Sequence, residues 1–413
     1  MNTQTTNINK DVIARSESDV VISSRETKPL VPQLRFSEFE SAWVRSTIGE
    51  VCSMKAGSYM KASQISGEKL EGMFPCYGGN GLRGYTKSFN KNGKFTLIGR
   101  QGAHCGNVKL VDGKFHATEH AVVVSLNNQY STDWIYYLLY ISNLNQYATG
   151  QAQPGLSVKG LESIKINFPT LPEQQKIASF LTAVDAKLQQ LTKKKELLQQ
   201  YKKGVMQQLF SQKLRFKPKP NDSVAERSRS YPDWEEKKLK DIIEFKNGKA
   251  HEQDIDEEGQ YVVVNSKFIS RNGEVRKYCK KQVSPLYKGD IVMVMSDIPN
   301  GKALAKCILI DENDKYSLNQ RICGLSEKDV INEFLIYILN RNRYYLRFDS
   351  GVGQTNLKKG EVLNCPLFIP SSKEEQQQIA SYLSALDTKI KSVVEALEAT
   401  QRFKKGLLQQ LFV

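Results

Sequence analysis

The chain has 413 residues, which is more than one hydrophobic core usually supports, so the length favours two domains. Hydrophobic residues make up 40% and charged residues 25% of the chain, a balance typical of folded globular proteins rather than of disordered or fibrous ones. With 59 Lys and Arg against 44 Asp and Glu, the formal charge is +15, which favours a polyanionic partner, nucleic acid before membrane.

Residues 1–29 are predicted to form a polar N-terminal tail. They mix Asn, Thr, Ser, Asp, Arg and Lys and lack the apolar stretch of a secretory signal. No apolar run in the sequence approaches the roughly 18 residues that a membrane-spanning helix needs. The seven cysteines are dispersed, odd in number and never spaced as CxxC, which favours reduced thiols and a cytoplasmic location.

Residues 30–171 form the first predicted globular domain, of α+β class. Residues 94–98 and 121–126 are short β-branched runs that predict strands, and residues 132–144 favour a short helix. Two glycine-rich loops carry polar, basic and aromatic side chains that suit DNA, because Arg can bond guanine, Asn and Gln adenine, and Lys the phosphates. The alternative is that these loops are ordinary exposed turns. The candidate DNA-binding residues are Tyr77, Asn80, Arg83, Tyr85, Lys87, Arg100, Gln101 and Lys109.

A zinc site in this domain is the weaker interpretation of its histidines. His116 and His120 stand four residues apart with Cys105 nearby, a spacing that would suit zinc on a helix. Their segment leads directly into a predicted strand, however, and no paired Cys or fourth ligand stands at metal spacing. We therefore predict no metal site.

Residues 172–213 predict a first helical spacer. Apolar residues recur in alternating steps of four and three, as a heptad seam requires. The seam residues are Ile177, Leu181, Val184, Leu188 and Leu191. The seam weakens across residues 193–195 and then resumes with Leu198, Tyr201, Val205 and Leu209.

Residues 214–371 form the second predicted globular domain, with strands at 261–265, 290–295 and 307–311 and a helix at 329–343. Asp233 and residues 235–237 superficially resemble a nuclease carboxylate–lysine cluster, but they lie too close together, and a solvated turn is the better interpretation. The candidate DNA-binding residues of this domain are Asn265, Lys267, Arg271, Asn300, Lys302, Gln320 and Arg321.

Residues 372–413 predict a second helical spacer that repeats the first. Residues 375–412 align without gaps on residues 173–210, and half of the positions are identical. The seam continues in this copy at Ile379, Leu383, Leu386, Ile390 and Val393. Each helix would be about 57 Å long. We expect the two helices to pack as an antiparallel coiled coil in a pseudo-twofold chain; ordinary dimerisation helices are the alternative.

Motifs of a catalytic chain are absent from the sequence. It contains no GxxxxGK[ST] phosphate loop, no GxGxxG after a strand and no [DNS]PP[YFW] motif of amino-methyltransferases. Two alternatives stay open at this point: a DNA methyltransferase or nuclease with an unrecognised active site, and a structural protein whose helices merely dimerise.

The repeated motifs resemble the specificity subunit of type I restriction-modification enzymes. The resemblance rests on Leu34-Arg35-Phe36 with Trp43, on EQQ followed by IAxxL, on Asp185 or Asp387, and on the KKG and QQLF that end each repeat. Residues 77–85 (YGGNGLRGY) and 96–102 (TLIGRQG) are similar to one recurring type of recognition domain in that family.

The resemblance implies a non-catalytic, sequence-specific DNA-binding subunit. Its two target-recognition domains would read an asymmetric, two-part DNA site, because the domains differ while their helices match. The implied partners are two methyltransferase subunits and two restriction subunits that translocate and cleave DNA. S-adenosylmethionine, ATP and Mg²⁺ would belong to those partners, and no cofactor to this chain.

Overall fold

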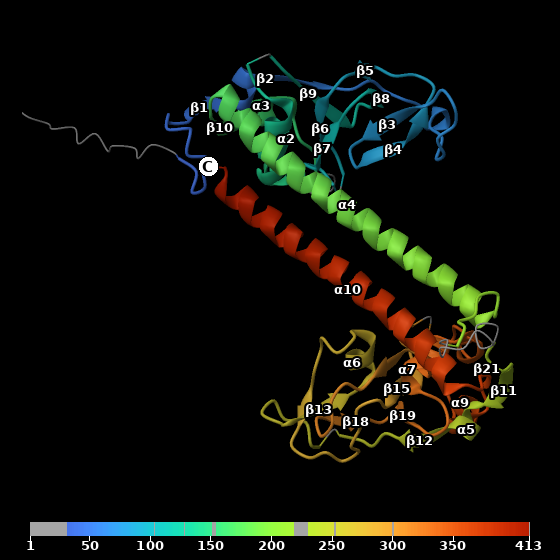
Figure 1. Cartoon of the computed structure of the whole chain (residues 1–413). Coiled ribbons are helices and arrows are strands. Elements are labelled where there is room, and N and C mark those ends of the chain that lie inside the picture. The colour runs from blue at the N-terminus through green and yellow to red at the C-terminus, as the bar shows by residue number, and fades with distance from the viewer. Residues whose placement is uncertain are drawn as a thin grey trace, which may run out of the picture. The chain divides into compact units, whose positions relative to one another are not determined.

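The computed structural model describes residues 31–102, 104–127, 129–150, 154–218, 230–251, 253–299 and 301–412. The predicted polar tail at 1–29 lies outside these ranges. The chain divides into two compact units (Figure 1). The first unit runs to Leu188 and also contains the chain from Ala399 onward, and the second comprises Gln189–Glu398. The boundaries predicted at 30–171 and 214–371 stay predictions.

Two four-stranded sheets form the body of the first unit, with strand orders β2-β9-β6-β7 and β4-β3-β8-β5. The pair β1-β10 is separate and antiparallel. The predicted strands at 94–98 and 121–126 correspond to β6 and β9. The strands are β1 (Val44–Thr47), β2 (Cys52–Ala56), β3 (Phe74–Gly78), β4 (Gly81–Thr86), β5 (Lys91–Asn92), β6 (Phe95–Gly99), β7 (Val108–Val111), β8 (Lys114–Ala117), β9 (Ala121–Leu126) and β10 (Lys165–Phe168).

Helix α2 (Thr132–Ile141) packs against β6 and β7 and supplies the fully buried Trp134 to the core. The predicted helix at 132–144 is three residues too long, because Asn143 adopts a left-handed backbone (φ 47°) that ends the α-helix. The other helices of this unit are α1 (Ile48–Val51), η1 (Ala62–Gln64), η2 (Leu144–Tyr147) and α3 (Val158–Glu162).

The second unit has a four-stranded sheet of order β12-β19-β15-β17, a three-stranded sheet β14-β13-β18 and the pairs β11-β21 and β16-β20. The predicted strands at 261–265, 290–295 and 307–311 correspond to β13, β15 and β17, each shorter than expected. The strands are β11 (Trp234–Lys238), β12 (Ile243–Asn247), β13 (Tyr261–Val264), β14 (Tyr278–Cys279), β15 (Ile291–Val294), β16 (Ser296–Asp297), β17 (Cys307–Leu309), β18 (Tyr316–Leu318), β19 (Ile322–Glu327), β20 (Thr355–Asn356) and β21 (Pro366–Pro370).

The helix predicted at 329–343 is two helices in the structure, α7 (Asn332–Leu339) and α8 (Arg343–Leu346). The break falls at Arg341, whose backbone is left-handed (φ 58°). The remaining short helices are α5 (Leu239–Ile242), α6 (Ser266–Ser270) and α9 (Lys359–Leu363). Both units therefore combine helices with sheets, and the α+β class is confirmed.

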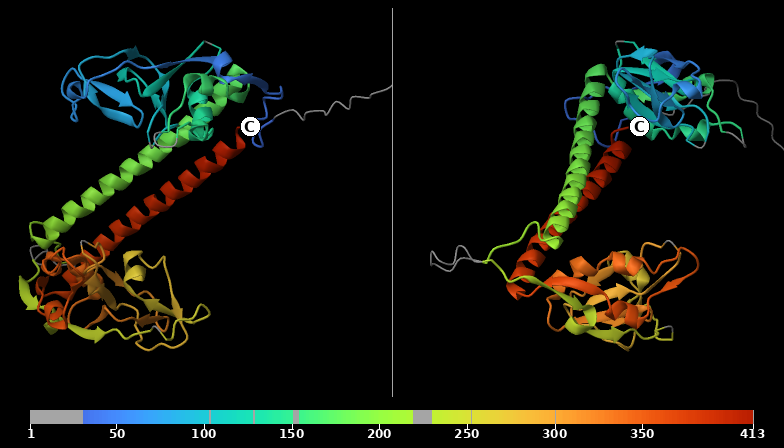
Figure 2. Two further views of the ribbon diagram at one scale, coloured as in Figure 1. Left: turned by 180° about the vertical axis from the view of Figure 1, so that it is seen from behind. Right: turned by 90° about the vertical axis from the view of Figure 1, so that its right-hand side faces the viewer.

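Two long helices, α4 (Leu171–Phe210) and α10 (Lys373–Gln410), carry the repeat (Figures 1 and 2). In the first unit, Leu181 near the start of α4 shares a core with Leu411 after the end of α10. In the second unit, Leu209 near the end of α4 shares a core with Leu383 near the start of α10. The start of each helix thus packs with the end of the other, as in an antiparallel pair.

Six of the ten seam residues belong to these cores: Ile177, Leu181 and Val184 to the first, and Ile379, Leu383 and Leu386 to the second. The burial of all ten follows the predicted seam. Eight of them are buried, whereas Leu188 and Ile390 are half-buried. Tyr201, in the resumed seam of α4, departs from the pattern because it is 52% exposed. Its hydroxyl instead makes a 2.7 Å hydrogen bond with that of Tyr382.

Candidate nucleic-acid interface

A hollow of about 430 Å³ in the first unit brings together three of the predicted DNA-binding residues. Asn80 and Arg83 come from the β3–β4 hairpin, and Gln101 comes from the loop after β6. His120 also lines the hollow, although the sequence had suggested it only as a metal ligand. Parts of the two glycine-rich segments, residues 78–83 and residues 101 and 102, therefore lie around one hollow.

Close backbone packing explains the glycines around this hollow. A Cβ on Gly99 would stand 2.0 Å from the carbonyl oxygen of Gly79, so no side chain fits there. Gly81, at the hairpin turn, has φ +87°, a conformation that L side chains rarely adopt. Lys109 lies against this turn, its Nζ 3.2 Å from where a Gly81 Cβ would stand. Close packing and the turn conformation of the backbone thus require these glycines, and the polar side chains beside them remain available to a ligand.

The other candidates of this unit lie elsewhere. Lys87 lines a different hollow, of about 420 Å³, with Met60 and Met73. Tyr77 packs edge-on against Phe115, and burial raises the pKa of its phenol, with Tyr85 adding to the shift. Arg100 is half-buried, and its backbone carbonyl accepts a hydrogen bond from the Leu156 amide. The structure therefore does not bring all eight candidates to one place.

In the second unit the candidate residues have mixed surroundings. Asn265 caps α6, because its Oδ1 accepts a 2.9 Å hydrogen bond from the Phe268 amide, so that oxygen is already used. Lys267 lies within α6, and Arg271 follows its end. Lys302, Gln320 and Arg321 are exposed, and Arg321 has a left-handed backbone (φ 68°). Asn300 lies outside the described residues.

The sequence did not single out a cluster of positive charge in this unit. Lys306 donates a 2.8 Å hydrogen bond to the Ser270 carbonyl, and Arg341 donates to the Leu304 carbonyl at 3.1 Å. Burial lowers the pKa of Lys306, and the nearby charges of Arg271 and Arg341 lower it further. Like charges held together in this way attract an anion such as a DNA phosphate. Only the tertiary fold reveals the cluster, since its members are far apart in sequence.

The remaining sequence predictions concern metals, cysteines and membranes. His116 lies in β8, where its Nε2 is 3.3 Å from the Ser58 carbonyl oxygen, and His120 pairs with Glu119 at 3.2 Å. Across the described part of the chain, no cluster of three His, Cys, Asp or Glu residues has the geometry of a metal site. The seven cysteines are buried and unpaired. None of the described helices is both long and apolar enough to span a bilayer.

Each of the two units has its own sheets and its own loops with candidate DNA-binding residues, and parts of both long helices pack into each unit. The chain is thus a two-unit protein built on an internal repeat. A family model described as "Type I restriction modification DNA specificity domain" matches residues 40–200 and 231–399, so the chain belongs to this family. The resemblance read from the sequence is thereby confirmed.

Individual relatives agree with this assignment. The chain is 45% identical over 160 residues to the specificity subunit of the type I restriction enzyme EcoprrI from Escherichia coli, covering 38% of this chain and 40% of that protein. It is 26% identical over 401 residues to the MjaVIII specificity subunit from Methanocaldococcus jannaschii, covering 89% of this chain and 92% of that protein. The crystal structure of the S subunit of a type I restriction-modification system from M. genitalium shares the fold, with a TM-score of 0.67 at 19% identity over 93% of this chain and 99% of that one.

Proposed function

We propose that this chain is a non-catalytic specificity subunit that reads an asymmetric, two-part DNA site. The observation that carries the proposal is the hollow in which Asn80, Arg83 and Gln101 converge, because these side chains suit the edges of adenine and guanine. The second unit presents a different set of residues, so its half-site would differ from the first. Lys306 and its neighbouring arginines would hold the phosphate backbone beside it.

Chemistry would reside in partner subunits. We assign adenine methylation to two methyltransferase subunits and DNA translocation and cleavage to two restriction subunits. S-adenosylmethionine, ATP and Mg²⁺ would be held by those partners, because this sequence carries neither a phosphate loop nor an amino-methyltransferase motif. This chain would recognise the DNA target sequence to which the partners are directed.

The direct test is to co-express the chain with the methyltransferase subunit of its own system and to map methylated adenines across a plasmid library. We expect one asymmetric two-part motif with a fixed gap, methylated on both strands. A stable complex of the two proteins without methylation at any such motif would favour a structural role for this chain instead.

Single substitutions in the hollow should relax one half of the motif. We expect Arg83→Ala and Gln101→Ala each to lose about 1–3 kcal/mol of discrimination at one base pair, because a bidentate contact to a base edge is lost. Lys87→Ala is the control for base discrimination, since Lys87 lines a different hollow and a lysine contact to phosphate carries no base information. Competition binding with single-base variants of the motif measures the effect. A loss of base discrimination in both halves of the DNA motif, or in neither half, would contradict the proposal that Arg83 and Gln101 read bases.

A further inference from the structure

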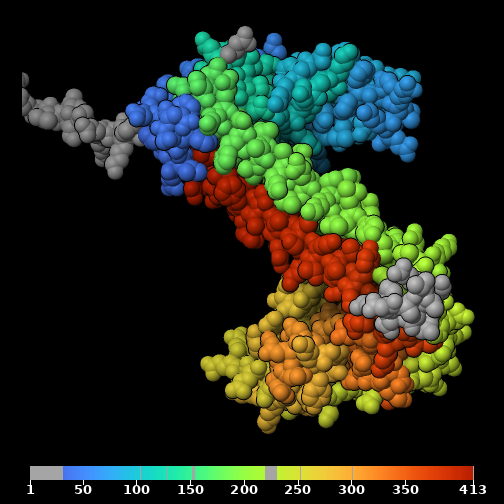
Figure 3. Space-filling model, in the orientation of Figure 1, coloured from blue at the N-terminus to red at the C-terminus, as the bar shows by residue number. Residues whose placement is uncertain are grey.

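Two branched apolar side chains of the second unit stand in solvent. Ile298 is 68% exposed and Val352 is 85% exposed. This unit is a closely packed body in the space-filling view (Figure 3), and comparable side chains such as those of Val294 and Ile322 fill its core. A single exposed valine or isoleucine is common on protein surfaces, so what matters is whether the two lie together.

Both residues belong to one cluster of loops. Strands β16 and β20 pair antiparallel, so the loop that leaves β16 and the loop that enters β20 start from the same end of the pair. Ile298 is the first residue of one loop, and Val352 stands three positions before β20 in the other. The Gln354 side chain donates a 2.7 Å hydrogen bond to the Ser296 hydroxyl and so ties the second loop to β16.

An aspartate organises the loop that carries Ile298. The Asp297 carboxylate accepts hydrogen bonds of 2.7–2.9 Å from three backbone amides of its own loop, those of Ile298, Ala303 and Leu304. A Cβ on Gly301 would stand 2.2 Å from Asp297 Oδ2, so only glycine leaves room for this carboxylate. The backbone of the loop is thus folded onto Asp297, and the Ile298 side chain is left outside.

A second aspartate organises the loop that carries Val352. Asp349 Oδ1 accepts a 3.0 Å hydrogen bond from the Gly351 amide and a 3.1 Å hydrogen bond from the Thr355 hydroxyl. Gly351 and Gly353, on either side of Val352, both have a left-handed backbone (φ 70° and 74°), a conformation that favours glycine. These two turns leave the Val352 side chain on the outside of the loop.

The charge around the two apolar side chains suits a polyanion. The carboxylates of Asp297 and Asp349 are already engaged by groups of their own loops. Lys302, in the first loop, is exposed. Arg321 is exposed too, and its carbonyl accepts a 2.9 Å hydrogen bond from the amide of Met295, the residue just before β16. Cations beside the loops would hold DNA phosphates and so position the loops on the duplex.

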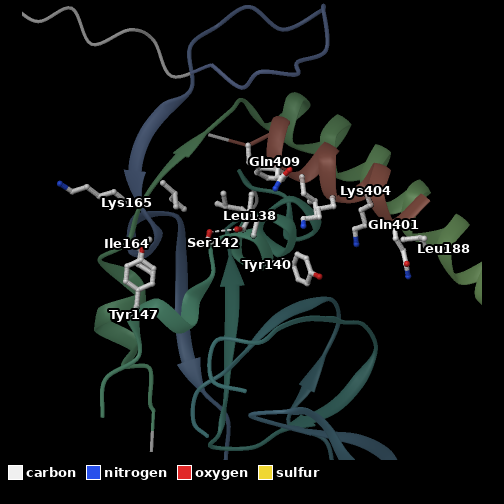
Figure 4. A pocket seen from close by; sticks show the side chains of 15 residues that line it. Leu138, Tyr140, Ser142, Tyr147, Ile164, Lys165, Leu188, Gln401, Lys404 and Gln409 are labelled. Carbon is white, nitrogen blue, oxygen red and sulfur yellow. Dashed lines mark hydrogen bonds between the residues drawn. The ribbon is translucent and has the colours of Figure 1, made fainter. Parts of the chain in front are cut away.

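Other apolar surface of the chain has a different form. In the first unit, Leu138, Tyr147 and Ile164 help to line a groove of about 860 Å³ (Figure 4). A concave surface of this kind receives side chains of a ligand. A loop that carries one protruding aliphatic side chain instead reaches into a groove of its ligand, and the major groove of DNA, about 12 Å wide, admits protein elements.

We propose that Ile298 and Val352 recognise thymine in the second half of the DNA site, by packing against its C5 methyl group in the major groove. This inference rests on the proposed function, which supplies the DNA. An aliphatic side chain neither donates nor accepts a hydrogen bond, and the thymine methyl is the apolar group that base pairs present in the major groove. Cytosine lacks this methyl group, so the contact distinguishes a T·A pair from a C·G pair. Because the aspartates already order both loops, little conformational entropy is lost on binding.

Uracil substitution in the DNA tests this contact, because it removes the methyl group and nothing else. The full chain, in complex with its methyltransferase subunit, is titrated with duplexes that carry the mapped motif. Each thymine is changed to uracil in turn in the half that Arg83→Ala and Gln101→Ala leave unchanged. We expect the affinity to fall about fourfold for at least one substitution, since burial of one methyl group contributes about 0.8 kcal/mol.

Alanine substitutions in the protein complete the test. Val352→Ala and Ile298→Ala should each abolish the uracil effect at one position, so that thymine and uracil duplexes bind equally well there. Neither change should lower the melting temperature, because both side chains are exposed. Val44→Ala is the matched control, because Val44 is also 68% exposed but lies in β1 of the first unit. It should leave every uracil effect in place.

The outcomes separate this inference from the proposed function. Wild-type binding that is insensitive to uracil throughout this half, a half without an A·T pair, or uracil effects that persist in both variants would each overturn the inference and leave the proposed function standing. Variants that bind DNA normally but lose the methyltransferase subunit would also overturn it and assign the loops to a protein contact. A chain that directs methylation to no two-part motif would overturn both.

Discussion

At the scale of single residues, each unit buries one carboxylate at the start of a long helix. Glu173 is fully buried and accepts hydrogen bonds from Arg35 Nε and Nη2, both at 2.8 Å, and from Trp43 Nε1 at 3.2 Å. In the second unit, Arg215 makes the same paired contacts with the buried Glu375, at 3.0 and 2.8 Å. A buried carboxylate with its partner removed remains desolvated and uncompensated.

Arg35→Ala should therefore lower the free energy of unfolding by about 3–5 kcal/mol, the usual effect of breaking a buried ion pair. Urea denaturation followed by tryptophan fluorescence measures the change, since Trp43 touches the same carboxylate. Lys193→Ala is the control, because Lys193 and Glu196 form an exposed pair whose loss should change the stability by less than about 0.5 kcal/mol. If Arg35→Ala lowered the free energy of unfolding by less than about 1 kcal/mol, water would have to solvate the Glu173 carboxylate in place of the lost guanidinium.

That the candidate residues face DNA stays a prediction, and the structure shows only which of them lie together. Asn80, Arg83 and Gln101 were predicted and do converge. Asn265 was predicted on the same grounds, yet it caps a helix, and residue type alone cannot separate these two uses of an Asn side chain. His120 and Lys306 were not among the DNA-binding candidates because their neighbours come from distant parts of the chain, which no local pattern shows.

At the scale of elements, the limits of a helix were predicted more accurately where its apolar residues recur at a regular spacing over many turns. The long helices begin within one residue of their predicted starts and end three residues before their predicted ends, because the heptad seam repeats over many turns. The shorter helices at 132–144 and 329–343 were predicted too long, since nothing in the sequence marks Asn143 and Arg341 as left-handed residues. Burial of the seam arises from tertiary packing, so the exposure of Tyr201 could not be foreseen either.

The interrupted seam of α4 allows a stability test. Lys195 stands four residues after Leu191 and three before Leu198, a seam position, and is half-buried. A polar residue at such a position lowers stability relative to an apolar one. Lys195→Leu should therefore raise the free energy of unfolding by about 1 kcal/mol, measured by chemical denaturation. Lys194→Leu, one position off the seam and exposed, should give no gain. Equal effects of the two substitutions would show that the seam does not continue through this stretch.

At the scale of the whole molecule, each compact unit is built from segments that are far apart in the sequence. The first unit takes in the end of the chain: the Leu34 amide donates a 3.0 Å hydrogen bond to the Gln410 carbonyl, and the rings of Phe412 and Trp134 lie 5.8 Å apart. The second unit takes in the end of α4, whose Phe210 ring lies 6.5 Å from that of Trp234. The last residues of each repeat thus complete the core of the unit in which they lie.

Two equivalent leucines make this division testable. Leu411 and Leu209 occupy the same position of the repeat and are both 1% exposed, Leu411 in the core of the first unit and Leu209 in that of the second. Leu411→Ala should destabilise by about 2–5 kcal/mol, as cavity-forming substitutions do, although residue 411 is 285 or more positions after β6 and β9. Hydrogen exchange should then accelerate in β6 and β9 and stay slow in β15 and β19. Leu209→Ala should produce the reverse pattern. Because both substitutions remove the same atoms from the same motif, equal acceleration in both units after either one would show that the chain unfolds as one cooperative body rather than as two.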